Sequence, residues 1–240
     1  MVQNGRFRLT FELGILLLAV LLPFLLVNFN QTLGIVFGFM VLFDLAIVDI
    51  IRRRRGELLF SVERDFNRVY DVGLAVGGTV VFTVFMAFVS LFLDRSATFT
   101  VAIQSVFQSW QATAPVLQTS ALLAAIGWIV IIPWVESGYM FGRIQGLFII
   151  VAKLRRDEVK LSTPLMWVIF IATSLTFAVF HLTVRAVAVR EGGIIEFDTF
   201  GLIGHFTFGM ISCMMVVYKK ELFSAKIMHI LFNGVSAISG

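Results

Sequence analysis

Long apolar runs separated by short polar segments make up nearly the whole chain. A helix that crosses a bilayer needs about 20 mostly apolar residues, and seven runs approach or exceed that length. They cover residues 11–29, 33–51, 72–93, 119–152, 165–187, 198–218 and 222–238. We therefore expect an all-α bundle of about seven transmembrane helices, with six to eight as the range.

The fourth run and the segment before it depart from this pattern. Run 119–152 is too long for one straight crossing, and Pro133 lies inside it, where proline removes a backbone donor and clashes with the preceding turn. We expect either one long bent helix or two shorter pieces. Gln104, Gln108 and Gln111 interrupt segment 97–118, which is predicted to be interfacial or re-entrant. The chain thus divides into N-terminal helices with this segment, residues 1–118, and a core, residues 119–240.

Composition excludes a soluble protein. Of the 240 residues, 59% are apolar and 14% are charged, against about 25% charged in an average soluble protein. A soluble chain of this size has too little interior for so many apolar side chains. The net charge of +4 does not indicate a nucleic-acid partner, because the basic residues cluster between apolar runs, as membrane-topology signals do. The partner that this composition predicts is the lipid bilayer.

Basic residues also indicate the orientation. With the N-terminus in the cytoplasm, fifteen of the nineteen Lys and Arg residues fall in inner segments, as the positive-inside rule requires. They are Arg6 and Arg8, Arg52 to Arg55, Arg64, Arg68, Lys153, Arg155, Arg156, Lys160, Lys219, Lys220 and Lys226. The first run ends without a small-x-small cleavage site, so we interpret it as an uncleaved span. The sequence therefore predicts a multi-pass integral membrane protein with a cytoplasmic N-terminus.

Ionisable side chains inside the apolar runs are the candidates for function, because placing them in lipid is expensive. Several have a structural explanation. Asp49 faces an arginine cluster, Arg185 is expected to snorkel outward, and His205 is interpreted as a hydrogen-bonding strut between helices. The complete set is Asp44, Asp49, Glu136, Arg143, His181, Arg185, His205 and His229, with Asn233 as a neutral companion.

Three of the predicted helices each carry such a group near mid-span. Glu136 lies in the first of them and His181 in the second. In the third, His229 and Asn233 are four residues apart, which places them on one helix face, about 6 Å apart along its axis. A carboxylate and an imidazole can deprotonate water, and a second imidazole and an amide can donate hydrogen bonds to an oxyanion. These are the parts of a hydrolase that attacks an amide with water.

The order of these residues resembles the CAAX protease and bacteriocin-processing family of intramembrane proteases. Its pattern is Glu-Glu-x-x-x-Arg, then Phe-x-x-x-His, then His-x-x-x-Asn, on separate helices. Phe177 and His181 match the second motif, and His229 and Asn233 match the third. Residues 206–209, Phe-Thr-Phe-Gly, resemble the glycine-containing helix between the last two motifs. The resemblance covers the predicted core.

The first motif is altered. Pro133 precedes Glu136, as a proline typically precedes the first glutamate of the family. Ser137 stands in place of the second glutamate and Phe141 in place of the arginine. Arg143 is two positions late, about 200° further round a helix of 3.6 residues per turn. In the family the first glutamate activates water and the other two residues look like its support, so this chain keeps the first and changes its support.

The resemblance implies an intramembrane endopeptidase acting on peptides or lipid-modified peptides near the membrane. Glu136 with His181 would activate water, and His229 with Asn233 would stabilise the oxyanion. The family includes enzymes for prenylated CAAX C-termini and members that act in peptide processing or export. No cofactor is expected, and zinc on Glu136, His181 and His229 is the alternative. The chain has no His-Glu-x-x-His pair, the strong sequence signal for zinc.

Three other classes of function fit parts of the pattern. A catalytically impaired family member acting as an immunity or scaffold protein fits the altered first motif. A transporter or proton relay would use Asp44, Glu136 and the histidines, but the sequence has no visible inverted repeat. A haem protein would use His181 and His229 as axial ligands. The sequence carries no signal for an oligomeric state.

Overall fold

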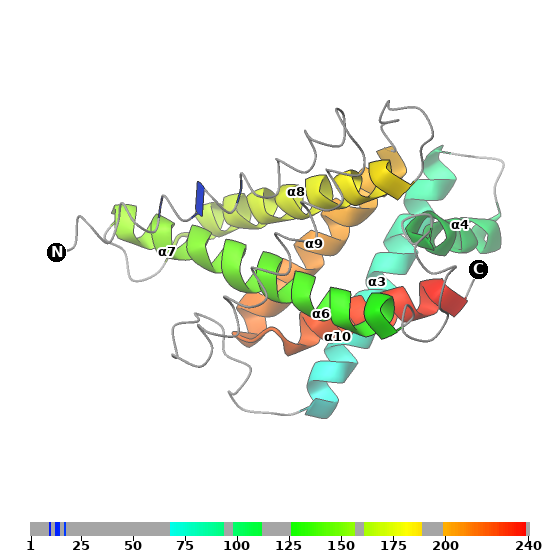
Figure 1. Ribbon diagram of the computed structural model, residues 1–240, viewed down its shortest axis with the longest axis horizontal. Helices are drawn as coiled ribbons and strands as arrows, with labels where there is room; N and C mark the ends of the chain where they lie inside the picture. Colours follow the sequence, from blue (N-terminus) through cyan, green and yellow to red (C-terminus); the bar gives the residue numbers. More distant parts are fainter. Residues whose placement is uncertain are drawn as a thin grey trace.

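Helices make up every element in the described part of the chain (Figure 1). The computed structural model describes residues 68–93, 98–111, 126–156, 161–188 and 199–238, with Thr10, Leu13, Gly14 and Leu17 as isolated positions. No strand occurs within these ranges, so the predicted all-α fold is confirmed. The elements are α3 (Arg68–Leu93), α4 (Phe99–Gln111), η2 (Gly127–Ile131), α6 (Ile132–Ser137), η3 (Gly138–Ile144), α7 (Gln145–Arg156), α8 (Thr163–Ala188), α9 (Thr199–Lys219) and α10 (Phe223–Ile238).

The predicted apolar runs recur as helices where the structure describes them. Helices α3, α8, α9 and α10 begin and end within four residues of the predicted runs. Within the described ranges, three helical stretches are long and apolar enough to cross a membrane: Arg68–Leu93, Thr163–His181 and Thr199–Lys219. The predicted span 33–51 and most of 11–29 lie outside the described residues. Helix α4 belongs to the segment expected at the interface, and that placement stays a prediction.

The long fourth run forms one continuous helical stretch over residues 127–156. Its segments η2 and η3 have the wider π-helical turn, whereas α6 and α7 are α-helical. Pro133 lies in the first turn of α6, directly after η2. Proline cannot donate to the carbonyl four residues earlier, and a widened turn accommodates both the missing bond and the ring. The structure therefore favours one irregular helix over two pieces, and Glu136 lies between its π-helical stretches, which are frequent at functional sites.

Helices from distant parts of the sequence surround this irregular helix (Figure 1). Helix α8 contacts η3 and α7, α10 contacts η2 and α6, and α9 packs along α8. Phe82 of α3, Phe208 of α9 and Phe232 of α10 form a fully buried aromatic cluster. Their ring centroids are 5.5 Å (Phe82–Phe208), 4.8 Å (Phe82–Phe232) and 6.0 Å (Phe208–Phe232) apart. Such pairs contribute roughly 0.5–1.5 kcal/mol each beyond their burial, so this cluster ties α3, α9 and α10 together.

A tight turn joins α9 to α10 and fixes where α10 begins. Lys220 has a φ of 57°, the left-handed conformation in which helices commonly end. The buried carboxylate of Glu221 then accepts hydrogen bonds from the backbone N–H groups of Phe223 at 2.9 Å and Ser224 at 3.3 Å. These bonds satisfy donors that a helix start otherwise leaves without partners. Helix α10 is thereby anchored about two turns before His229.

Helices α8 and α9 approach each other closely at Gly209. A Cβ atom at this position would lie 3.0 Å from the Cα atom of Ser174 and 3.1 Å from its Cβ atom. A helix backbone cannot move aside as the tip of a flexible side chain can, so the approach requires glycine. Gly209 therefore allows α9 to lie directly against the helix that carries His181.

We expect Gly209→Ala to lower the free energy of unfolding by about 1–3 kcal/mol, because the added methyl group overpacks the contact with Ser174. Thermal unfolding in detergent measures the change. Gly77→Ala is the matched control, since a Cβ atom there meets nothing within 4 Å. The control should be neutral or stabilising by roughly 0.5–1 kcal/mol, as alanine favours helix. Equal losses in the two variants would contradict the close-packing explanation.

Candidate active site

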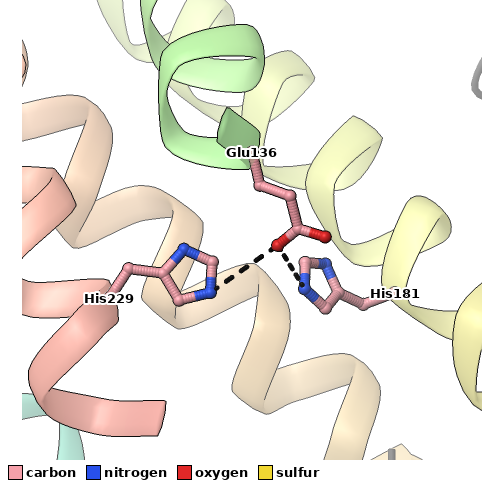
Figure 2. Close-up of side chains that lie close together, drawn as sticks. All are labelled: Glu136, His181 and His229. Atoms are coloured by element: carbon pink, nitrogen blue, oxygen red, sulfur yellow. Dashed lines mark ion pairs between the residues drawn. The ribbon is translucent and has the colours of Figure 1, made fainter. Parts of the chain in front are cut away.

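One carboxylate oxygen, Glu136 Oε2, is shared by two imidazoles from two other helices. It lies 3.5 Å from Nε2 of His181 and 3.8 Å from Nε2 of His229. Figure 2 shows the carboxylate of α6 between the rings of α8 and α10. All three residues are buried, with 6%, 6% and 1% of their surface exposed. The structure thus brings together three of the four residues that the sequence proposed for chemistry, around a single oxygen atom.

The orientation of His181 is set by its own helix. Its Nδ1 atom lies 3.0 Å from the carbonyl oxygen of Phe177, four residues earlier. A carbonyl oxygen can only accept, so Nδ1 carries the proton and donates it. In the neutral ring Nε2 then presents a lone pair, and that atom faces Glu136. Residue 177 thus orients the histidine through its backbone carbonyl, and the phenylalanine side chain adds a ring contact with the imidazole, with centroids 4.1 Å apart.

His229 is held from its other side by the residue next to Glu136. The hydroxyl oxygen of Ser137 lies 3.1 Å from Nδ1 of His229. The ring of His229 also packs against Phe208, with ring centroids 5.0 Å apart. Sequence reasoning treated Ser137 as a departure from the family pattern and gave it no role. Its position beside Glu136 in a helix that meets α10 was the signal that could have indicated the contact.

The third histidine of the chain also lies in this cluster. His205 of α9 stacks on His181 of α8, with ring centroids 4.5 Å apart and planes inclined by 26°. Its Nδ1–H donates to the carbonyl oxygen of Gly201 in its own helix, at 2.6 Å. His205 was predicted to be a hydrogen-bonding strut between helices; its hydrogen bond to Gly201 lies within α9, and its stack on His181 is a contact with α8. The sequence contains three histidines, and all three gather here.

Aromatic packing occupies the place where the family pattern has its arginine. Phe141 is fully buried and its ring lies 5.3 Å from that of Phe177, centroid to centroid. Phe177 in turn packs on His181 at 4.1 Å and on Phe208 at 5.8 Å. An uncharged pair, Ser137 and Phe141, thus stands where the pattern has a glutamate and an arginine, and both members support the histidines.

The remaining candidates are placed only in part. Asn233 is buried in α10 with 2% of its surface exposed, one turn beyond His229. Arg143 is buried within η3. Asp44 and Asp49 lie outside the described residues, and only the backbone of Arg185 is described.

The same three groups have the chemistry to hold a divalent metal ion. Donor atoms of Glu136, His181 and His229 lie within 4.8 Å of one another. One carboxylate with two histidines is a known ligand set of catalytic zinc sites, which keep a fourth position for water. His181 suits this role, because metal-binding histidines usually donate their other N–H to a carbonyl or carboxylate. For His229 the fit depends on the direction of its hydrogen bond with Ser137.

Comparison with known proteins identifies the core. No curated protein and no solved structure matches the chain significantly. A model of one protein family, described as type II CAAX prenyl endopeptidase Rce1-like, matches residues 118–235, about half of the chain. The apolar helices and this match together identify an integral membrane protein. Residues 118–235 therefore form a domain that matches the Rce1-like family of type II CAAX prenyl endopeptidases, as the order of the motifs predicted.

Proposed function

We propose that this protein is an intramembrane endopeptidase in which Glu136 and His181 activate the attacking water. The observation that carries the proposal is the shared oxygen of Glu136, which lies within 3.8 Å of imidazole nitrogens from α8 and α10. The match of residues 118–235 to a family of prenyl endopeptidases supports it. Burial of all three groups supports it too, since electrostatic stabilisation is stronger where water is excluded.

In the proposed reaction the water oxygen attacks the carbonyl carbon of the scissile peptide bond. One water proton passes to the carboxylate of Glu136, while the lone pair on Nε2 of His181 accepts a hydrogen bond from the other and aims the water. The carbonyl oxygen becomes an oxyanion that receives hydrogen bonds from His229 and Asn233. The carbon–nitrogen bond then breaks, and Glu136 returns its proton to the leaving amine. No redox step is needed and every proton is accounted for.

The proposed substrates are peptides near the membrane, with lipid-modified C-terminal CAAX peptides as the first class to test. The family description names prenyl endopeptidases. An active site formed by helices within an apolar bundle favours a substrate that the lipid itself delivers. We also propose that the N-terminus lies in the cytoplasm, because most of the basic residues then lie on the inner side.

The test is cleavage of quenched-fluorescence peptides by the purified full chain in detergent or in vesicles. The panel contains a farnesylated CAAX peptide, its unmodified counterpart and a scrambled farnesylated peptide. Cleavage of the farnesylated CAAX peptide above the other two supports both the activity and the substrate class. Equal cleavage of all three keeps the peptidase and rejects the lipid preference. Failure to cleave any of them favours the second candidate, a catalytically impaired scaffold, which the replacements at Ser137 and Phe141 bring into consideration.

We expect cleavage to persist, within about twofold, after the protein is treated with a chelator and the chelator is removed, since general base catalysis by a carboxylate needs no metal. Metal analysis of the purified protein accompanies the assay. Loss of activity that only zinc restores, with about one zinc bound per chain, would replace the glutamate mechanism by a metal site on Glu136, His181 and His229.

A further inference from the structure

The hydroxyl group of Ser137 makes a hydrogen bond to a side chain on another helix. Ser137 is fully buried, and it makes no capping bond to the backbone. Three threonine hydroxyl groups in the described helices, those of Thr79, Thr83 and Thr176, donate to the carbonyl four residues earlier. Ser137 instead contacts Nδ1 of His229, its one hydrogen-bond partner among the residues that the structure describes.

The direction of this bond follows from the cost of burial. A buried O–H group without an acceptor loses the hydrogen bond that water would have given it, which destabilises the protein. The oxygen lone pairs can be left without a donor at lower cost. Nδ1 of His229 is the described partner of the hydroxyl group. The hydroxyl proton therefore has a hydrogen-bond acceptor only if Ser137 donates it to that nitrogen. The neutral ring then carries its own proton on Nε2.

We infer that Ser137 is a positioning residue that fixes His229 in the Nε2–H tautomer and thereby makes it a hydrogen-bond donor at the reaction centre. The inference rests on the proposed function for its catalytic meaning, but the tautomer itself is a property of the resting protein. Nε2 is the atom of His229 that faces Glu136, at 3.8 Å. The serine that replaces the second glutamate of the first motif thus acts on the third motif.

The two histidines beside Glu136 then have opposite hydrogen-bonding roles at Nε2, one as an acceptor and the other as a donor. His181 donates from Nδ1 to the carbonyl of Phe177 and offers a lone pair at Nε2. His229 accepts at Nδ1 from Ser137 and offers a proton at Nε2. One ring can therefore accept a hydrogen bond from the water while the other donates to the oxyanion. The division of roles comes from which group each Nδ1 atom meets.

This tautomer also opposes metal binding by His229. A ring that carries its proton on Nε2 has no lone pair there for a metal ion. Ligation would require the bond to reverse, so that Nδ1–H donates to the Ser137 oxygen. The hydroxyl proton would then lose the one described acceptor it has. Ser137 thus favours the metal-free alternative for this chain.

The test is nitrogen NMR of the full chain with ¹⁵N-labelled histidine at about pH 8, where a histidine of ordinary pKa is neutral. Protonated and unprotonated ring nitrogens have well-separated shifts. With three histidines in the sequence, the signals can be assigned by comparison with His205→Gln and His229→Gln. We expect a protonated Nε2 and an unprotonated Nδ1 for His229. A protonated Nδ1 on His229 would overturn the inference, whether or not the protein cleaves any peptide.

Substitution of Ser137 links the tautomer to the reaction. Ser137→Ala should mix the two tautomers of His229 and lower kcat by about two- to tenfold with little change in KM, as expected for one hydrogen bond. Ser137→Thr keeps the hydroxyl and should restore both readouts. Ser212→Ala is the matched control, a fully buried serine of α9, and should change neither. Parent-like NMR signals and kcat in Ser137→Ala would overturn the inference, and a loss shared equally by Ser212→Ala would do the same.

Discussion

We expect Glu136→Gln to lower the kcat of peptide cleavage by a factor of about 10²–10⁴, the range that general base catalysis contributes. The amide of glutamine has nearly the shape of the carboxylate but cannot take a proton from water. Its contacts with His181 and His229, at 3.5 and 3.8 Å, remain possible because an amide can both donate and accept. The substitution therefore removes the base and leaves the packing. The measurement is single-turnover cleavage of the peptide that the parent protein cleaves best.

Glu221→Gln is the matched control for this change. Glu221 is also a buried glutamate, with 3% of its surface exposed, but its carboxylate serves the first turn of α10. Its replacement should cost some stability through weaker helix capping, typically about 1 kcal/mol, and change kcat by less than about threefold. A Glu136→Gln protein that unfolds like the parent and cleaves at the parent rate would remove Glu136 from the mechanism. If Glu136→Gln kept a biological effect of the parent while losing cleavage, the scaffold function would gain support.

The helical architecture was predictable because lipid imposes a simple rule on sequence. A crossing helix must be apolar along its whole length, so its ends are marked by the first polar residues, and α8, α9 and α10 begin and end close to the predicted positions. The irregular helix was harder to predict. Pro133 indicated a disturbance, but whether a helix breaks or widens depends on neighbouring helices that can satisfy its backbone, and these are not visible in the local sequence.

The candidate site was predictable in its parts and not in its contacts. Spacing of four residues placed Phe177 with His181 on one helix face, and the structure adds that the phenylalanine supplies the carbonyl that orients the ring. Nothing in the local sequence placed His205 against His181, because a ring stack between α8 and α9 depends on how closely Gly209 lets those helices approach. Contacts between distant segments are decided by packing, which periodicity does not encode.

The role of the altered first motif also depends on contacts between distant segments, which the local sequence does not show. A glutamate and an arginine in the family pattern can neutralise each other, so replacing both by uncharged residues leaves no buried charge without a partner. In this chain the replacements make new contacts, Ser137 with His229 and Phe141 with Phe177. Taken alone, the replacement at Ser137 or at Phe141 suggests a loss of function. In the folded protein the two residues form an uncharged support, Ser137 for His229 and Phe141, through Phe177, for His181.

We expect His229→Leu, which leaves no donor at this position, to lower kcat by about 10²–10³, the usual effect of removing one oxyanion donor, and to leave KM nearly unchanged. An interaction made only with the oxyanion exists in the transition state and not in the bound substrate, so its loss appears in kcat. His205→Leu is the matched control, because it removes a third buried imidazole, which stacks on His181 but takes no step in the proposed reaction. The control should lose less than about tenfold.

Asn233→Ala tells whether the two polar residues of α10 act on one oxyanion. Asn233 follows His229 by one turn and is buried on the same helix. If both donate to the same oxygen, the double variant loses less than the product of the two single losses, since residues that act as a unit are not additive. If His229 instead held a metal ion, His229→Leu would also abolish zinc binding, whereas Asn233→Ala would leave the zinc content unchanged. Kinetics of the two single variants, the double variant and their metal content therefore distinguish a hydrogen-bond donor from a metal ligand at His229.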